Sequence, residues 1–407
     1  MKNYYEIAEV ADLLSVSKET LRRWDRNGKL PAVRHPMSNY RVYSKEQLKV
    51  FDSLSFLFDS TEFGNQVVPK REYKSIELFA GAGGLAIGLE KAGIKCVALN
   101  EFDHWACETL RKNRPDWNVI EDDVKNVSFK QYKGKIDIVT GGFPCQAFSY
   151  AGKKLGLNDA RGTLFYEFAR IVKETKPPIC IGENVRGLLS HENGLTIKGM
   201  ISILDEIGYN VIDPTVFKTI FYNVPQKRER LLIVGIRKDI SKELYDFPKP
   251  HKTVYNLRDA LKKGELYNCD VPMSPGTKYP QSKKEVLDQV PQGGYWKDLP
   301  VSVQMQYMGK SFYLGGGKTG MARRMSWDEP SLTLTCSPAQ TQTERCHPEE
   351  TRPFTVREYA RIQTFSDNWV FSGSISQQYK QIGNAVPVNF AKEIGCSIVK
   401  FLNSINP

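Results

Sequence analysis

Two features are missing from this sequence of 407 residues: paired cysteines and long apolar segments. Its eight cysteines are scattered with no C-x-x-C pair, so their spacing suggests neither a zinc site nor a disulfide framework. No apolar run approaches the roughly 18 residues of a membrane span, and the opening residues lack the pattern of a signal peptide. We therefore expect a cytoplasmic protein with no bound metal and no membrane association.

Positive charge, in contrast, is in excess. The chain has 57 Lys and Arg against 46 Asp and Glu, which gives a formal net charge of +11. This excess fits a polyanionic partner such as nucleic acid. A hydrophobic content of 41% is typical of a globular protein, and the length predicts two or three domains.

The amino-terminal segment has the pattern of two short helices joined by a tight turn. Apolar residues recur at helical spacing over residues 5–14, and Ser17 is a suitable N-cap for a second helix over residues 18–26. Gly28 would end that helix, and Ser44 to Gln47 form a capping box that opens another. Two helices in this arrangement predict a helix-turn-helix, whose second helix usually enters the major groove of DNA.

This segment resembles the MerR-type helix-turn-helix in residues 7–11, 13–17, 20–24, 28–31 and 41–44. The resemblance implies a DNA-binding domain over residues 1–58, with Arg22, Arg23 and Arg26 as DNA contacts. The long dimerisation helix of full-length regulators is missing, so dimerisation stays open. A helical module for protein contacts is the alternative. Residues 59–74 read as a linker.

A new domain begins with a strand over residues 75–79, a glycine-rich turn over 80–84 and a helix over 85–92. This is the start of a nucleotide-binding βα unit. A second strand, residues 96–100, ends in Glu101, where an acid can bind ribose hydroxyls. No lysine follows the glycines as in a P-loop, so an adenosine cofactor without a pyrophosphate fits better. Asp123 is placed to read an adenine amino group.

Three later segments carry candidate reactive side chains. A strand over residues 136–140 leads through Gly141, Gly142 and Pro144 to Cys145, which is either a nucleophile or a buried structural thiol. A strand over residues 178–182 delivers Glu183. Arg228 and Arg230 lie two residues apart and so share one face of an extended segment. The alternatives are that Glu183 is only a salt-bridge partner and that the two arginines lie on a solvated edge.

From about Ser75 to its carboxyl end, the chain resembles the DNA (cytosine-5)-methyltransferases in both the wording and the order of its motifs. The matching segments are Phe79-x-Gly81-x-Gly83-Gly84, Glu101, Asp123, Gly142-Phe143-Pro144-Cys145-Gln146, Glu183-Asn184-Val185, Gln226-x-Arg228-x-Arg230, Arg357 to Phe365, and Gln381 to Pro387. Ser366-Asp367 stands where Pro-Asp is common, which alters only a local turn.

The resemblance implies an α/β fold, the Rossmann-like fold of S-adenosylmethionine-dependent methyltransferases, with an inserted target-recognition domain. The catalytic domain would span residues 75–246 and resume at 345–407. The insert, residues 247–344, loses the βα pattern and is rich in Gly, Pro, aromatic and basic residues, which suit nucleic-acid contacts. A disordered insert is the alternative, although the aromatic content argues for folding.

The resemblance also assigns roles to individual residues. Cys145 would add to C6 of cytosine, with Glu183 at N3 and Arg230 at O2, and Arg228 would be a further catalytic residue. The cofactor S-adenosylmethionine would contact Phe79, Gly81, Gly83, Glu101, Asp123, Pro144 and Asn384. Gln146 would contact DNA beside the flipped base.

The expected partners are double-stranded DNA, a restriction endonuclease acting in the same modification system, and the protein's own promoter. Two other functions stay open at this point. One is a DNA-binding regulator with an inactive methyltransferase body, against which the intact catalytic motifs count. The other is a tRNA cytosine-5 methylase, against which the helix-turn-helix and the long insert count.

Overall fold

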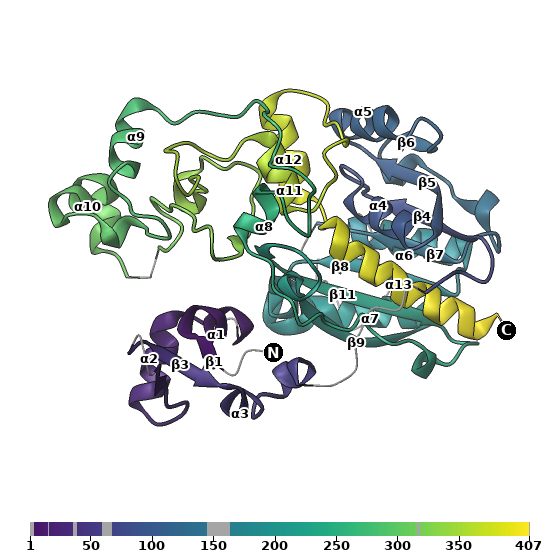
Figure 1. Cartoon of the computed structure of the whole chain (residues 1–407). Helices are drawn as coiled ribbons and strands as arrows, with labels where there is room; N and C mark the ends of the chain where they lie inside the picture. Colours follow the sequence, from purple (N-terminus) through teal and green to yellow (C-terminus); the bar gives the residue numbers. More distant parts are fainter. Residues whose placement is uncertain are drawn as a thin grey trace. The chain divides into compact units, whose positions relative to one another are not determined.

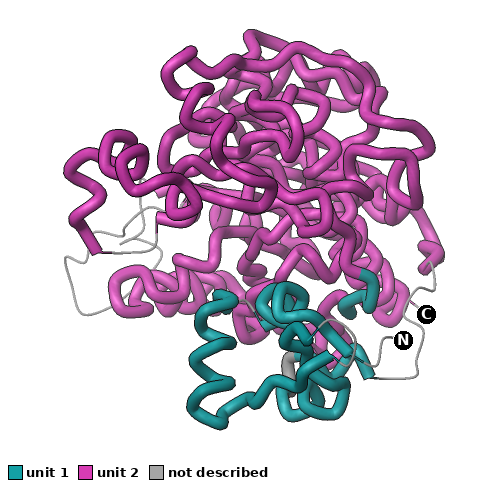
Figure 2. Tube along the Cα trace, turned by 60° about the vertical axis from the view of Figure 1, so that its left-hand side comes forward, with its two compact units in different colours: residues 1–64, 249–253 teal, residues 65–248, 254–407 magenta. Residues whose placement is uncertain are grey.

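The computed structural model describes residues 4–14, 16–35, 39–58, 67–144, 163–315 and 318–406. The chain divides into two compact units, shown in Figure 2: residues 1–64 with 249–253, and residues 65–248 with 254–407. Among the described residues, no helix is both long and apolar enough to span a bilayer. We describe each unit separately.

The first unit is a small helical module with a three-stranded antiparallel sheet of order β1-β3-β2. Its elements are β1 (Tyr4–Glu6), α1 (Ile7–Leu14), α2 (Lys18–Arg26), β2 (Val33–Arg34), β3 (Arg41–Ser44), α3 (Lys45–Leu48) and the 3-10 helix η1 (Asp52–Leu57). Val10, Leu21 and Leu48 are fully buried in its core. The predicted pair of helices is confirmed, and β2 with β3 forms the wing that follows it.

The helix caps of this unit are those predicted. Ser17 Oγ accepts the Thr20 N–H at 2.9 Å, and Gly28 after α2 has a left-handed φ of 70°. Ser44 and Gln47 satisfy each other's backbone N–H groups in a capping box. These local signals determine where α2 begins and ends and where α3 begins.

The second unit is built on a seven-stranded mixed sheet of order β6-β5-β4-β7-β8-β11-β9, labelled in Figure 1. The strands β4, β5, β6, β7 and β8 run parallel, whereas β11 is antiparallel to both of its neighbours. Their bounds are β4 (Tyr73–Leu78), β5 (Ile94–Glu101), β6 (Val119–Glu121), β7 (Ile138–Gly141), β8 (Ile179–Asn184), β9 (Tyr209–Lys218) and β11 (Glu229–Arg237). The predicted α/β fold is confirmed.

Helices cover both faces of this sheet. The core on one face includes residues of α4 (Gly84–Lys91), α5 (His104–Asn113) and the start of α13 (Val388–Ile405). The core on the other face includes residues of α6 (Leu164–Thr175) and α7 (Leu195–Glu206). A Cβ on Gly88 of α4 would lie 2.3 Å from the Cβ of Ala391 in α13, so only glycine permits this approach. The predicted closing helix from Val388 is confirmed.

The edge strand β9 was absent from the sequence prediction. Pro214 interrupts it, and the pairing with β11 shifts register between Leu232 and Val234. Proline is tolerated at a sheet edge or a bulge, and a half-buried edge strand has no continuous apolar run. The strand was missed because these features weaken the pattern. Another difference is that Glu183 lies within β8 rather than after it.

The insert between β11 and the returning segment is mostly irregular, as predicted, yet it is folded. It contains α8 (Leu257–Leu261), α9 (Gln281–Leu287), α10 (Val301–Met308) and β12 (Ser331–Leu332). A separate apolar cluster includes Leu287, Trp296, Leu299 and Met308. Aromatic residues of the insert therefore take part in a core. Regular structure resumes with α11 (Val356–Ile362), opened by the predicted Thr355 capping box, and α12 (Ile375–Asn384).

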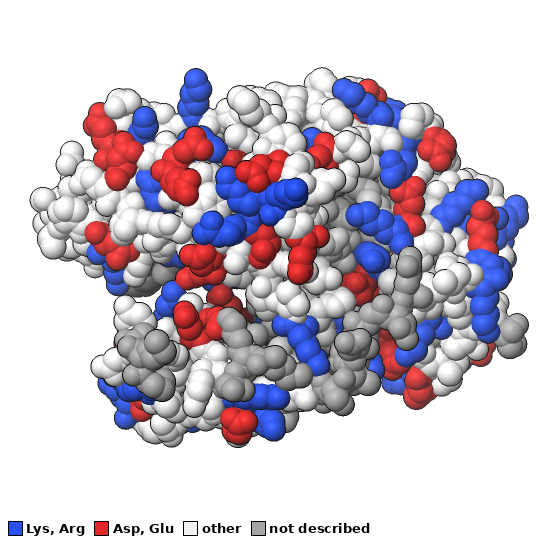
Figure 3. Space-filling view, in the orientation of Figure 1, with Lys and Arg blue, Asp and Glu red and all other residues white. Residues whose placement is uncertain are grey.

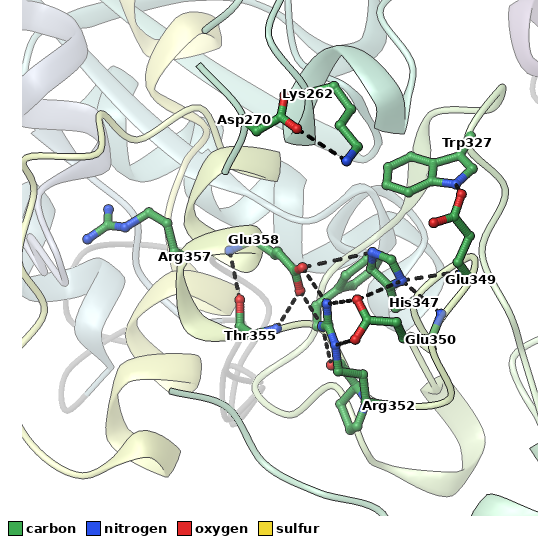
Figure 4. A network of polar contacts seen from close by, with 12 residues as sticks. Lys262, Asp270, Trp327, His347, Glu349, Glu350, Arg352, Thr355, Arg357 and Glu358 are labelled. Carbon is green, nitrogen blue, oxygen red and sulfur yellow. Dashed lines mark hydrogen bonds and ion pairs between the residues drawn. The ribbon is translucent and has the colours of Figure 1, made fainter. Parts of the chain in front are cut away.

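Figure 4 shows a network of polar contacts where the insert joins the returning segment. Arg352 binds Glu358 with both ends of its guanidinium, at 2.8 and 2.9 Å, and Glu350 at 3.0 and 2.9 Å. His347 Nδ1 accepts the backbone N–H groups of Glu349 and Glu350 at 3.3 and 3.1 Å. The ring is therefore held with Nδ1 unprotonated.

This network predicts a pH-dependent stability. Burial lowers the pKa of His347, and Glu358 opposes that effect only in part. Below the ordinary histidine pKa of about 6.5, the unfolded chain takes up a proton that the folded chain resists, so stability falls as pH falls. We expect His347→Asn, whose amide oxygen can still accept, to lose less stability than wild type from pH 7 to pH 5.5. Urea unfolding of both proteins at pH 7 and pH 5.5 gives the loss in free energy of unfolding. The loss for wild type should exceed that for the variant by at most about 1.4 kcal/mol per pH unit. An equal loss in both proteins would contradict the prediction.

Candidate active site

The glycine-rich turn after β4 opens the site. Gly81 and Gly83 have φ angles of 53° and 82°, and the non-glycine Phe79 has 58°. Left-handed backbone suits glycine but strains a phenylalanine, and such strain recurs at ligand-binding turns. The turn thereby brings main-chain groups to the carboxyl end of the sheet, where open α/β sheets bind ligands.

Glu101, at the end of β5, organises that turn. Its Oε2 accepts the Gly81 N–H at 2.7 Å, while its Oε1 accepts the N–H groups of Phe102 and Asp103 at 2.9 and 2.8 Å. A carboxylate offers about four acceptor positions, so one remains for an outside donor such as a ribose hydroxyl. The glycine turn and the acid predicted 20 residues later thus meet directly.

Glu77 is a functional candidate that sequence reasoning missed. Its side chain is 2% exposed and faces the same cleft, and its Oε2 has no hydrogen-bond partner among the described residues. Burial, and then the charge of Glu101, raises the pKa of Glu77 well above its ordinary value. A charged residue inside an apolar strand is the signal that could have found it.

The loop that leads toward Cys145 is anchored at two points. The Phe143 ring packs against Phe165 and Phe168, with centroids 5.1 and 5.6 Å apart. The Phe143 carbonyl accepts a hydrogen bond from Asn184 Nδ2 at 2.8 Å. Asn184 therefore ties the loop to the end of β8, a role that its motif did not reveal.

Glu183 and Arg230 form a buried ion pair on neighbouring strands. Glu183 lies opposite Leu232, and Arg230, two residues earlier on β11, shares the face of Leu232. Arg230 Nε lies 2.5 Å from Glu183 Oε1, and each residue is 8% exposed. Burial lowers the pKa of Arg230, and Glu183 opposes this. Removing either partner would leave a buried charge uncompensated, which costs about 3–5 kcal/mol.

Arg228 lines the cleft but has different contacts. Its Nη1 donates to the Leu334 carbonyl at 3.2 Å, and its Nη2 donates to the Gly383 carbonyl at 2.9 Å. Burial, and then the charge of Arg230, lowers the pKa of this guanidinium. The two predicted arginines therefore differ: one pairs with the acid, and the other holds main-chain groups in place.

These residues line one cleft of about 630 Å³. Predicted site residues on its wall are Phe79, Gly81, Glu101, Pro144, Glu183, Arg228, Arg230 and Asn384. Gly83 and Asp123 are not among the lining residues. Gly83 supplies the left-handed N-cap of α4, and Asp123 caps a short 3-10 helix by accepting the Lys125 N–H. Cys336 lies 3.1 Å from Asn384 Oδ1 on the same wall.

Two predicted residues, Cys145 and Gln146, lie outside the described residues, just after Pro144. The three predicted DNA contacts of the amino-terminal unit lie exposed on α2, where Arg22 and Arg26 both pair with Glu19 at 3.2 and 3.1 Å. On the face in view in Figure 3, Lys and Arg are intermixed with Asp and Glu.

One cluster of the described residues has metal-ligand chemistry. His104, Glu108 and Glu121 present their donor atoms within 4.8 Å of one another. Arg111 pairs with Glu108 at 3.1 Å and with Glu121 at 2.5 Å. The guanidinium already pairs with both carboxylates, so we interpret this cluster as a surface ion-pair network.

An open α/β sheet with a glycine turn, an acid and a buried Glu–Arg pair around one cleft is typical of an enzyme whose ligands bind at the carboxyl ends of the strands. The comparisons with known proteins are more specific. The model of the family described as C-5 cytosine-specific DNA methylase matches residues 73–400, and that of the MerR family regulatory protein matches residues 6–43. The chain belongs to the C-5 cytosine-specific DNA methylase family.

Relatives match over nearly their whole length. The chain is 60% identical to the type II methyltransferase M.Eco47II of Escherichia coli, covering 100% of this chain and 98% of the relative. It is 57% identical to M.PspPI of Psychrobacter sp. (strain TA137), covering 99% and 97%. The structure of the Entamoeba histolytica methyltransferase EhMeth superposes with a TM-score of 0.55 at 16% identity, covering 83% and 99%, which shows the fold. The predicted class of enzyme, a DNA (cytosine-5)-methyltransferase, is confirmed.

Proposed function

We propose that this enzyme transfers a methyl group from S-adenosylmethionine to C5 of a cytosine in a specific sequence of double-stranded DNA. The observation that carries the proposal is the buried Glu183–Arg230 pair, which shares one cleft with the glycine turn and Pro144. An acid and a guanidinium side by side match the N3 and O2 edge of a cytosine.

The residues present fit the cofactor. Phe79, Gly81 and Glu101 would hold its adenosine part, and Glu77 would bring a buried carboxyl group with an unpartnered Oε2 to the same cleft. Asn384 would contact it from the opposite wall. When bound, S-adenosylmethionine supplies an electrophilic methyl group.

The chain's own residues then act on the cytosine. The Cys145 thiolate forms a bond to C6, and the electron pair of the C5–C6 double bond moves toward N3 and O2. Glu183, which must carry a proton for this step, donates a hydrogen bond at N3 while Arg230 stabilises the charge at O2. C5 is then electron-rich enough to attack the methyl group that the cofactor would supply. Loss of the C5 proton expels the thiolate and restores the aromatic ring. A stacked base cannot reach these groups, so the target must flip out of the duplex.

Two measurements test this function. Bisulfite sequencing of DNA from cells that express the enzyme is expected to show one methylated sequence at high occupancy. A duplex with 5-fluorocytosine at that site is expected to remain covalently attached, because fluorine cannot leave as the C5 proton does. Methylation of tRNA without methylation of DNA would overturn the proposal, as would no methylation of either.

We also propose that the insert, residues 247–344, selects the target DNA sequence. We further propose that the enzyme acts in one modification system with a restriction endonuclease. The insert has its own apolar core and also places Thr333 to Cys336 on the cleft wall. An insert with a core of its own that also lines the cleft is suited to reading base pairs beside the reacting base. The relatives' designation as type II methyltransferases supports the pairing.

The amino-terminal unit suggests a second DNA target, because the chemistry does not need it. We propose that it binds the enzyme's own promoter, with Arg22, Arg23 and Arg26 reaching bases and phosphates from the exposed face of α2. A modification enzyme must accumulate before a nuclease cuts, and control of its own synthesis would limit any excess.

A chain that starts at Lys70 is therefore expected to keep its methylation specificity and most of its activity, within about threefold. Only the full chain should retard a fragment of its own upstream region over competitor DNA at fixed, moderate salt. A matched full-length variant, Arg23→Ala, should weaken that retardation without changing methylation. Retardation by both chains, or a general loss of methylation on truncation, would instead indicate a module that only adds affinity.

A further inference from the structure

Leu334 lies on the insert wall of the cleft, and buried side chains bind both of its main-chain polar groups. Its N–H donates to Gln226 Oε1 at 2.9 Å, and its carbonyl accepts from Arg228 Nη1 at 3.2 Å. Gln226 is fully buried and Arg228 is 2% exposed. The short parallel pairing of β10 (Gln226–Lys227) with β12 brings these residues together.

The first of these contacts continues through a second buried glutamine. Gln226 Nε2 donates to Gln363 Oε1 at 2.9 Å, and Gln363 is also fully buried. Gln363 Nε2 in turn donates to the carbonyls of Ile382 and Ala385, at 2.8 and 3.2 Å. Each amide can satisfy its neighbours in only one orientation, because reversing either would set two donors or two acceptors face to face. The chain of bonds therefore has a fixed direction.

The second contact also reaches the carboxyl end of α12, by another route. Arg228 Nη2 donates to the Gly383 carbonyl at 2.9 Å. A Cβ on Gly383 would lie 2.3 Å from the Thr335 carbonyl, so the two backbones touch here. Asn384, the predicted cofactor contact, follows directly. Both routes thus join the insert wall to the cofactor wall through groups that have no water to replace a lost bond.

We propose that cofactor binding is coupled to binding of the target duplex by three side chains: Gln226, Arg228 and Gln363. We call these three side chains the Leu334 bridge. The inference rests on the proposed function. Cofactor binding fixes the carboxyl end of α12 at residues 382–385, and the bridge transmits that order to β12 and the residues after it, 331–336. Such a coupling is reciprocal, so the duplex must tighten cofactor binding by the same factor. In this role Gln226 and Gln363 are positioning residues that touch neither ligand.

The coupling factor is the ratio of the duplex Kd without and with saturating S-adenosylhomocysteine, measured by fluorescence anisotropy at fixed salt. The probe duplex carries the site mapped by bisulfite sequencing. In wild type we expect a factor of at least about 5. Gln363→Met keeps the side-chain volume but breaks the bridge, and should bring the factor to within twofold of 1. Tyr209→Phe is the control, because it removes a buried hydrogen bond to Pro177 in the edge strand and should leave the factor unchanged.

Hydrogen–deuterium exchange on the wild type gives a readout that needs no variant. S-adenosylhomocysteine alone should slow exchange at residues 331–336 as well as at 382–386. Protection confined to residues 382–386 would overturn the proposal, and so would an unchanged coupling factor in folded Gln363→Met or a wild-type factor of 1. Failure of the wild type to bind S-adenosylhomocysteine or the duplex at all would instead refute the proposed function.

Discussion

A Cys145→Ser chain is expected to bind its target duplex with unchanged affinity and to transfer methyl groups at a rate lower by about 10³-fold or more. A serine hydroxyl remains protonated at neutral pH, so it cannot add to C6 as a thiolate does, whereas exchanging sulfur for oxygen changes the size of the side chain only slightly. Incorporation of a radiolabelled methyl group measures the transfer, and anisotropy measures the affinity. The covalent complex with 5-fluorocytosine should vanish in the variant.

The control is Cys396→Ser, the same chemical change on helix α13, which should keep activity within about twofold. Methyl transfer by Cys145→Ser at a normal rate would exclude the thiol mechanism. Loss of activity in both variants would show only that the fold tolerates serine poorly, and thermal unfolding of each protein detects that outcome.

Exchange of residues 247–344 for the insert of a relative with a different target should move methylation to the relative's site. The expected effect is large, because each wrong base pair costs a specific DNA-binding protein about 1–3 kcal/mol and several pairs are read. The graft must keep a residue equivalent to Leu334, whose main-chain groups bind Gln226 and Arg228. Bisulfite sequencing of cellular DNA gives the result directly.

An active chimera that still methylates the original site would refute this role for the insert. A matched control graft takes the insert from a relative with the same target. It should retain both the site and the activity, which shows that the junctions themselves are tolerated.

Much of the fold could be predicted from local patterns in the sequence. The capping boxes at Ser44 and Thr355 and the apolar strands β4, β5 and β11 depend on neighbours within a few residues. Strand β9 could not be predicted, because a half-buried edge with Pro214 lacks both alternation and a continuous apolar run.

The site was predicted less completely, because its contacts join distant segments. Gln226 and Gln363 are 137 residues apart, and nothing in either motif shows that their amides meet. The buried state of Glu77 and the different partners of Arg228 and Arg230 also depend on packing. The motifs identified which residues gather at the cleft, whereas their individual roles required the three-dimensional arrangement.

The close approach of α4 and α13 has a consequence for synthesis. Gly88 fits against Ala391, and Tyr73 at the start of β4 donates its hydroxyl hydrogen to Asn403 at 2.7 Å, a contact across 330 residues. The cover of this face of the sheet, to which α4 and α5 also contribute, thus stays incomplete until α13 has left the ribosome, at a synthesis rate of about 5–20 residues per second. The nascent chain must spend tens of seconds with apolar surface exposed, so the enzyme is expected to depend on chaperones during translation. The amino-terminal unit has its own core and can fold during that interval.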